Sequence, residues 1–213
     1  MPLPESPCAS AASPVAGFRA AHHGRAPEDP LVLPGPWDAG SARAFRDAGF
    51  SALATPSAGV AASLGHEDGA LPFTEMFAAV ARITRAVDVP VSADLEGGYG
   101  LAPKELVERA LEAGAVGCNL EDSERHVLKD PRRHADWLAE VVAAADGALV
   151  LNARVDTFLA GDTDPASAVA RARLYVAAGA DCVYPIACPR DAVPALRAGI
   201  EGPINVVSPS PGP

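Results

Sequence analysis

The chain has 213 residues, of which 49% are hydrophobic, and a chain of this size can bury the core of one sizeable domain. Its formal net charge of −10 argues against nucleic acid as a partner, and it contains no apolar run long enough to cross a bilayer. The four cysteines form no C-x-x-C pair, which argues against a zinc site, and no secretory signal is visible, so we expect a cytoplasmic protein without membrane or nucleic-acid partners.

Two stretches of unusual composition delimit the expected domain. Residues 1–16 are rich in Pro, Ala and Ser, a composition typical of a flexible tail. Residues 208–213 consist of Ser, Pro and Gly and form a second, shorter tail. We therefore expect one folded catalytic domain over residues 17–207, beginning with a short helical turn at residues 18–22.

Between the tails, short apolar runs alternate with helical patterns. The expected strands cover residues 31–33, 50–55, 91–93, 115–120, 148–153, 181–185 and 203–207. The expected helices cover residues 41–48, 74–87, 103–114, 131–145, 165–179 and 190–198, with a loop of small residues at 56–59. Ser41 and Thr74 are the expected N-caps of the first two helices. Gly49, Gly114 and Gly179 end three helices and are evenly spaced at 65 residues, which fits two strand–helix units per interval.

Strands that alternate with helices predict a parallel sheet covered by helices. Seven such strands point to a TIM-type (β/α)₈ barrel, with a doubly wound open sheet as the second possibility. No G-x-G-x-x-G motif follows the first strand, which weakens the dinucleotide-binding alternative. We expect a barrel that is truncated after its seventh strand. Its two exposed edges would favour self-association, so a homo-oligomer is expected.

The stretch from residue 89 to residue 100 carries the clearest functional signal. A buried strand ends in Asp94 and Glu96, and glycines that permit a sharp turn follow. Residues two apart at a strand end point to the same side, so the two carboxylates would repel each other. A hard divalent cation with oxygen ligands relieves such repulsion. The alternative is a surface loop with two solvated acids.

Further candidate functional residues follow the carboxyl ends of the other expected strands, where a βα barrel places its reactive groups. These residues are Trp37, Ser57, Ala58, Gly59, Glu121, Arg154 and Asn205. Glu121 and, from a loop, Asp68 would add oxygen ligands to those of Asp94 and Glu96 around Mg²⁺, with Mn²⁺ as a second possibility. The sequence therefore predicts a metal site at the carboxyl edge of the sheet.

Two of these groups suit an organic anion. Ser57, with the backbone N–H groups of Ala58 and Gly59, forms a small nest for a carboxylate. Arg154 offers a planar guanidinium that can bind a carboxylate or phosphonate through two parallel hydrogen bonds. Each group also has a structural alternative, because Ser57 can be a turn residue and Arg154 can pair with Glu121.

Three further candidates are less specific. Trp37 can belong to the core or to the wall of a pocket, and Asn205 can satisfy backbone groups at the barrel mouth. His126 follows Glu121 closely in the chain and is a candidate general acid or base.

Together these motifs resemble those of the isocitrate lyase/phosphoenolpyruvate mutase superfamily. The motifs are Trp37-Asp38, Thr55-Pro56-Ser57-Ala58-Gly59, Gly65-His66-Glu67-Asp68, Asp94-Leu95-Glu96-Gly97-Gly98-Tyr99-Gly100, Asn119-Leu120-Glu121-Asp122, Asn152-Ala153-Arg154 and Pro203-Ile204-Asn205-Val206. The resemblance covers about residues 18–207, and the order and spacing of several motifs make it specific.

The resemblance implies a (β/α)₈ barrel that binds Mg²⁺ and makes or breaks a C–C or P–C bond through an enolate. Its substrate would be a 2-oxo acid, or a related hydroxy acid or phosphonate. The resemblance assigns the metal site to Asp68, Asp94, Glu96 and Glu121, and substrate binding to Ser57, Ala58, Gly59, Arg154 and Asn205. With Trp37 as a further substrate contact, the candidate catalytic residues are Arg154, His126 and Asp68.

One loop departs from the superfamily pattern. The superfamily lyases carry a Lys-Lys-Cys-Gly loop whose Cys is the catalytic acid or base, whereas here Glu121 is followed by Asp122-Ser123-Glu124-Arg125-His126. Two hypotheses therefore stand side by side. The first is a Mg²⁺-dependent lyase, mutase or hydrolase, which the retained carboxylates favour. The second is an inactive barrel remnant that binds a small carboxylate or a protein partner, which the missing eighth strand favours.

Overall fold

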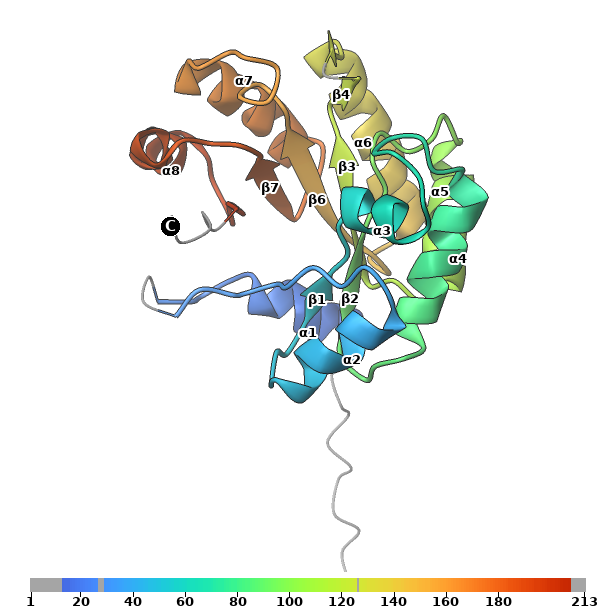
Figure 1. Ribbon diagram of the computed structural model, residues 1–213. Helices are drawn as coiled ribbons and strands as arrows, with labels where there is room; N and C mark the ends of the chain where they lie inside the picture. The colour runs from blue at the N-terminus through green and yellow to red at the C-terminus, as the bar shows by residue number, and fades with distance from the viewer. Residues whose placement is uncertain (1–12, 27–28, 126, 208–213) are drawn as a thin grey trace, which may run out of the picture.

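A parallel sheet, curled into a half-barrel, lies at the centre of the molecule (Figure 1). The computed structural model describes residues 13–26, 29–125 and 127–207. In spatial order the strands are β1 (Leu53–Ala54), β2 (Val91–Asp94), β3 (Gly117–Glu121), β6 (Val150–Val155) and β7 (Cys182–Pro185). Every neighbouring pair in this sheet is parallel, so all five carboxyl ends meet at one edge. The predicted TIM-type barrel is confirmed, in an open form.

The last expected strand, 203–207, continues the sheet beyond β7 through very few backbone contacts. Ile204 forms a single parallel bridge with Val183, and the Asn205 N–H donates to the Val183 carbonyl oxygen at 2.8 Å. The segment therefore lies where it was predicted but pairs less extensively than a regular strand.

The strand expected at residues 31–33 is wrong as a regular strand. In this region the sheet gains one hydrogen bond, from the Ala54 N–H to the Pro34 carbonyl oxygen (3.1 Å). Pro30, Pro34 and Pro36 have no N–H to donate, so this segment cannot form a continuous ladder. Counting the two edge segments, seven stretches of chain follow one another around the half-barrel.

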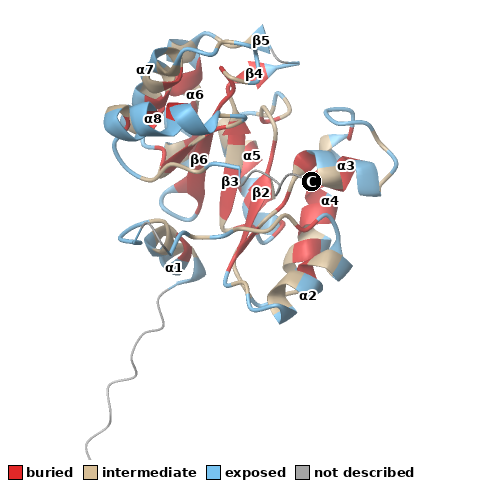
Figure 2. Ribbon diagram, turned by 60° about the vertical axis from the view of Figure 1, so that its left-hand side comes forward, coloured by how far each residue is buried: buried red, intermediate tan, exposed pale blue. Residues whose placement is uncertain are grey.

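Helices cover the outer face of the sheet (Figure 1). They are α2 (Ala39–Asp47), α4 (Phe73–Thr84), α5 (Pro103–Glu112), α6 (Pro131–Ala145), α7 (Pro165–Ala177) and, after the short turn η1 (Arg190–Ala192), α8 (Val193–Gly199). The strands β2, β3 and β6 are largely buried between the helices and the barrel interior (Figure 2). Ile83, Leu106 and Leu138 face this sheet–helix core and are at most 1% exposed.

Glycines end the helices as the sequence predicted. Gly49, Gly114 and Gly179 follow α2, α5 and α7 with φ angles of 92°, 80° and 101°. Residues with a Cβ rarely adopt this left-handed backbone conformation, so the repeated glycine marks the point where each helix turns toward the next strand.

Several local expectations are corrected. Residues 56–59 are not a loop throughout, because α3 (Ser57–Ser63) begins there and its alanines favour a helix. A two-stranded hairpin, β4 (Ser123–Glu124) and β5 (Val127–Leu128), was not predicted. Two N-caps also differ: Asp38 caps α2 and accepts the Ser41 N–H (2.7 Å), and α4 begins at Phe73 after Pro72.

The amino-terminal tail was expected to extend to residue 16. Residues 1–12 and 208–213 lie outside the described part of the chain, but α1 (Pro14–Ala21) already begins at residue 14 and takes the place of the expected turn at 18–22. Within the described ranges, no helix combines the length and the apolar character needed to cross a membrane.

Helix α1 covers the amino-terminal end of the half-barrel. Phe18 is 2% exposed and packs against Ala52 and Val150, which lie at the amino ends of the sheet strands. A Cβ on Gly117 would lie 2.9 Å from the Phe18 ring and 3.0 Å from the Val150 carbonyl oxygen. The absence of a side chain at Gly117 is what allows the phenyl ring to close this end.

The strand register stacks the interior side chains in layers. Asp94, Asn119 and Asn152 are paired across β2, β3 and β6 and form one layer. Glu121 and Arg154 belong to the next layer toward the carboxyl edge, where they are in register with Tyr184 on β7. Residues paired in parallel strands share a face, so the polar residues of both layers face the barrel interior.

We predict opposite effects of two glycine-to-alanine changes. Gly117→Ala should lower the free energy of unfolding by about 2 kcal/mol, because the new methyl group clashes with Phe18 and with the backbone. Gly17→Ala in α1 has open space around the new Cβ and should raise it by about 0.5–1 kcal/mol. Urea unfolding measures both, and equal effects of the two changes would contradict the proposed closure by Phe18.

Candidate active site

A cavity of about 1400 Å³ occupies the interior of the half-barrel and extends from Phe18 and Val150 at the amino ends of the strands to Asp94 and Glu121 at their carboxyl ends. Its wall includes the acids Asp94, Glu96 and Glu121 and the guanidinium of Arg154. Asp68, from the loop between α3 and α4, lies on the same wall. The four predicted metal ligands and the predicted anion-binding arginine therefore line one cavity.

Asp94 ends β2 and is held by residues at the start of α3. Its Oδ2 accepts hydrogen bonds from the Ser57 hydroxyl (2.9 Å) and the Ser57 N–H (3.3 Å), and its own N–H donates to Thr55 Oγ1 (3.1 Å). Asp94 is only 8% exposed, and burial raises its pKa against the opposing effects of Arg154 and Ser57. The Ser57 hydroxyl thus orients an acid of the site in addition to its predicted role toward substrate.

Glu96 reaches the same cavity by a different route from the one predicted. It lies in a turn after β2, with φ at 49°, so strand alternation does not aim its side chain. Its N–H donates to Asp94 Oδ1 (3.3 Å), and its Oε1 is buried without a hydrogen-bond partner among the described residues. Burial, together with the charges of Asp94 and Asp68, raises the pKa of Glu96 to about 7 against the opposing effects of Tyr99 and Arg154.

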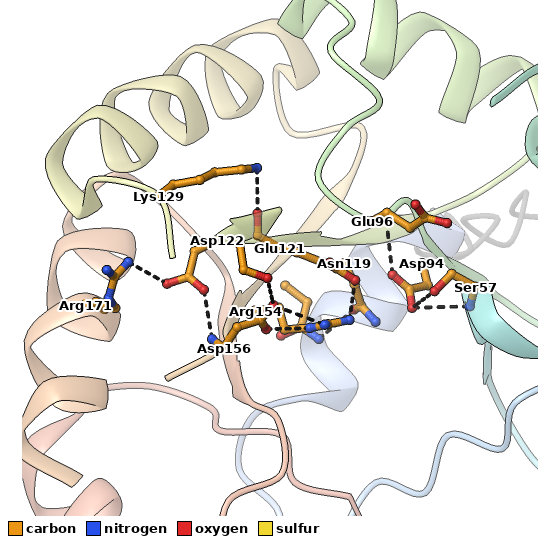
Figure 3. A network of polar contacts seen from close by, with 12 residues as sticks. Ser57, Asp94, Glu96, Asn119, Glu121, Asp122, Lys129, Arg154, Asp156 and Arg171 are labelled. Atoms are coloured by element: carbon orange, nitrogen blue, oxygen red, sulfur yellow. Dashed lines mark hydrogen bonds and ion pairs between the residues drawn. The ribbon is translucent and has the colours of Figure 1, made fainter. Parts of the chain in front are cut away.

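Glu121 and Arg154 are neighbours in the register of β3 and β6. Arg154 Nη1 donates to Glu121 Oε1, so the structural pairing considered for these two residues does occur. Burial nevertheless raises the pKa of Glu121 to about 8, because the opposing effect of Arg154 is incomplete and Asp94 and Asp156 add negative charge. Figure 3 shows these side chains converging at the strand ends.

Two buried acids behind Arg154 were missed by the sequence reasoning. Asp156 binds the Arg154 guanidinium through both carboxylate oxygens, and Asp122 accepts the Asp156 N–H (2.8 Å). Asp156 follows Arg154 by two residues along one strand direction, so the alternation rule applied to Asp94 and Glu96 could have identified it.

Lys129 is a further residue that the sequence reasoning missed. It follows the β4–β5 hairpin and lies on the cavity wall, where its Nζ donates to the Glu121 carbonyl oxygen at 3.0 Å (Figure 3). Burial lowers its pKa against the neighbouring acids. No local motif marks this lysine, because the hairpin that places it is itself not evident from the sequence.

The remaining predicted residues have mixed positions. Asn205 and Ala58 lie on the cavity wall. Trp37 and Gly59 do not line it: Trp37 is 45% exposed and its ring contacts Phe45 edge-on. His126 lies outside the described residues.

The donor set can be tested against the chemistry of Mg²⁺. Among the described residues, no three His, Cys, Asp or Glu side chains are close enough to hold a metal ion as they stand. The available donors are nevertheless all carboxylate oxygens, and one of them is buried without a partner among the described residues. Burial raises the pKa values of Asp94, Glu96 and Glu121, so the charged forms of these three acids are only partly stabilised by the protein. Mg²⁺ retains several waters and needs few direct protein ligands, so the residues present fit a partly hydrated Mg²⁺ ion.

Comparison with known proteins identifies related chains. The family model described as phosphoenolpyruvate phosphomutase matches residues 18–213. An uncharacterized protein of Mycobacterium tuberculosis (strain H37Rv), Rv1998c, is 37% identical over 86% of this chain and 71% of its own length. The 2-methylisocitrate lyase of Escherichia coli (strain K12) is 31% identical over 81% of this chain, and the match spans 62% of that enzyme.

A solved structure shares both fold and sequence with this chain. It is that of a proposed phosphonomutase from Burkholderia cenocepacia J2315, with a TM-score of 0.84 and 40% identity. The match covers 93% of this chain and 86% of that one.

We predict that the metal-free protein loses stability as the pH rises from 6.5 to 9. The folded protein holds protons on Glu96 and Glu121, whose pKa values near 7 and 8 exceed the ordinary 4.5, and the unfolded chain does not. A raised carboxyl pKa contributes stability below the unfolded value that is lost as the pH passes the folded value, here by about 2 kcal/mol.

Urea unfolding in EDTA across this pH range measures the loss. Glu96→Gln should flatten the dependence, and millimolar Mg²⁺ should restore stability at pH 9 because the cation replaces the lost protons. A free energy of unfolding that stays constant or rises between pH 6.5 and 9 in EDTA would contradict the prediction.

Proposed function

The chain belongs to the phosphoenolpyruvate phosphomutase family, within the isocitrate lyase/phosphoenolpyruvate mutase superfamily, and on this basis we propose that it is a Mg²⁺-dependent enzyme acting on a 2-oxo acid or a related carboxylate. It makes or breaks a C–C or P–C bond of that substrate through an enolate. The observation that carries the proposal is the convergence of Asp94, Glu96, Glu121 and Arg154 on one cavity at the carboxyl ends of parallel strands.

In the proposed site, Asp94, Glu96, Glu121 and Asp68 hold the Mg²⁺ ion, some of them through water. When bound, the ion supplies Lewis-acid stabilisation of negative charge on the 2-oxo oxygen. The raised pKa values of Glu96 and Glu121 support this assignment, because burial and neighbouring acids disfavour their charged forms and a bound cation would stabilise those forms.

The protein's own groups bind the charged ends of the substrate. Arg154 uses three of its five N–H groups on Asp156 and Glu121, which leaves donors for a carboxylate or phosphonate in the cavity. The Ala58 N–H lies in the first turn of α3, where a helix has no carbonyl partner for it, and serves the substrate carboxylate, whereas both Ser57 donors are used on Asp94 and Gly59 lies off the cavity wall. Asp68 and His126 are the proposed proton-transfer groups.

An inactive carboxylate-binding barrel is the alternative, and one observation favours it. The short hairpin β4–β5 stands where the superfamily lyases carry their Lys-Lys-Cys-Gly loop. The two functions separate in one experiment: the protein is incubated with Mg²⁺ and a panel of 2-oxo, 2-hydroxy and phosphono acids, and bond cleavage is followed by ¹H and ³¹P NMR. Cleavage above the level of Asp94→Ala supports the enzyme, whereas binding without turnover supports the alternative.

Asp94→Ala should abolish Mg²⁺ binding and leave the fold intact. Asp94 is one of the proposed metal ligands, and its burial already makes the charged form costly. The metal-free variant should therefore be as stable as the parent or slightly more stable. Titration calorimetry with Mg²⁺ measures the binding, with circular dichroism as the check on folding. Unchanged Mg²⁺ affinity would remove Asp94 from the site.

Arg154→Lys should weaken the binding of oxalate, a mimic of the pyruvate enolate, by at least about tenfold in the presence of Mg²⁺. The lysine retains the charge but loses the planar pair of donors, so Mg²⁺ affinity should change little. Calorimetry with Mg²⁺ alone and then with oxalate separates the two affinities. Equal oxalate affinity in parent and variant would mean that Arg154 is purely structural.

A further inference from the structure

The Arg154 guanidinium is held from behind by a single carboxylate. Nε donates to Asp156 Oδ1 at 2.6 Å and Nη2 donates to Asp156 Oδ2 at 3.1 Å. Two parallel bonds of this kind fix the plane of the guanidinium as well as its distance. Because Arg154 lies on the cavity wall, the orientation set by Asp156 decides where its remaining N–H groups point.

Asp156 is itself prevented from turning. It is fully buried, and the Ser123 hydroxyl donates to its Oδ2. Its backbone N–H donates to Asp122 Oδ1 (2.8 Å), which joins the end of β6 to the residue following β3 (Figure 3). Both carboxylate oxygens of Asp156 are therefore occupied, and no alternative rotamer could keep these bonds.

Asp122 anchors this arrangement to the outer helix layer. Its Oδ2 accepts hydrogen bonds from Arg171 Nη1 (3.0 Å) and the Tyr175 hydroxyl (2.7 Å), both on α7. Asp122 thus has its own cation, Arg171, and the cation that compensates Asp156 is Arg154. If Asp156 served only to attach α7, its side chain would contact that helix, but the described hydrogen-bond partners of the side chain are Arg154 and Ser123, and those of its backbone are Asp122 and Ala160.

We propose that Asp156 is the positioning residue for Arg154 in substrate binding, and that Asp122 and Ser123 hold Asp156 in place. The inference rests on the proposed function, since it assigns Arg154 to the organic anion. Asp156 does not touch the substrate. It acts by presenting the unused Arg154 donors in one orientation, so that they need not be ordered when the anion binds.

A double-mutant cycle on oxalate affinity tests the proposal. Asp156→Asn removes the charge of the carboxylate and one acceptor, and should weaken oxalate binding in Mg²⁺ by about tenfold. Arg154→Lys should weaken it at least as much. The double variant should bind oxalate within twofold of Arg154→Lys alone, because Asp156 acts only through the guanidinium. If the double variant instead lost oxalate affinity by the product of the two single-variant factors, the proposal would be overturned.

Matched variants separate positioning from general destabilisation. Asp181→Asn breaks the ion pair with Arg19 at the opposite end of the half-barrel and should lower stability without changing oxalate affinity. Ser123→Ala removes one hydrogen bond to Asp156 without altering its charge, and it should weaken oxalate binding by a smaller factor than Asp156→Asn. This second variant tests the proposal if Asp156→Asn fails to fold. If Asp181→Asn weakened oxalate binding as much as Asp156→Asn does, the proposal would also be overturned.

A measurement on the free protein distinguishes failure of this inference from failure of the proposed function. In protein labelled with ¹⁵N-arginine, the Arg154 Nε–H signal, assigned by its absence in Arg154→Lys, should be narrow and slow to exchange. It should broaden or exchange faster in Asp156→Asn and in Ser123→Ala. A parent that binds no oxalate would contradict the proposed function, whereas an Arg154 signal unchanged by both substitutions would contradict the positioning role itself.

Discussion

Carboxylates buried at one edge of a parallel sheet are the constraint on which this structure depends. A charge removed from water must be paired, hydrogen-bonded or neutralised by a proton. Asp122 and Asp156 are fully buried, and they obtain cations and hydroxyl donors from Arg171, Tyr175, Arg154 and Ser123. Toward the cavity the compensation is incomplete, since Glu96 retains a buried oxygen without a described partner. The unbalanced charge is therefore confined to the part of the edge where a cation and an anionic substrate would bind.

This distribution makes the two sides of Arg154 unequal. On the protein side its guanidinium closes a chain of bonds that runs through Asp156 and Asp122 to helix α7. On the cavity side it meets Glu121 and retains unused donors. A buried ion pair is weak support for stability, because desolvation offsets most of the attraction. The Arg154–Asp156 ion pair is better explained by the geometry it imposes, since a guanidinium fixed in one plane can recognise a planar carboxylate.

The opposite end of the half-barrel serves stability. There Phe18 closes the interior against Ala52 and Val150, and Gly117 leaves room for its ring. Apolar packing at the amino ends of the strands and charge at their carboxyl ends are thus separated along the barrel axis. Substitutions at Phe18 and at Arg154 should act independently, because the described packing partners of Phe18 and the described hydrogen-bond partners of Arg154 are different residues.

The sequence alone determined the parallel sheet, the helix-ending glycines and the gathering of Asp94, Glu121 and Arg154 at one edge. These follow from periodicity and from positions relative to strand ends, which are local properties. Only the tertiary structure decided how Glu96 enters the site from a left-handed turn, that Asp156 binds Arg154, and that Trp37 lies away from the cavity. The weak pairing of the segment before β1, by contrast, has a cause that is visible in the sequence, because a ladder requires N–H groups that Pro30, Pro34 and Pro36 lack. The physical reason for what the tertiary structure decided is the same in each case: a sequence pattern specifies which side of an element a residue faces, whereas contacts between elements depend on register and turn conformation, which form only when the chain packs.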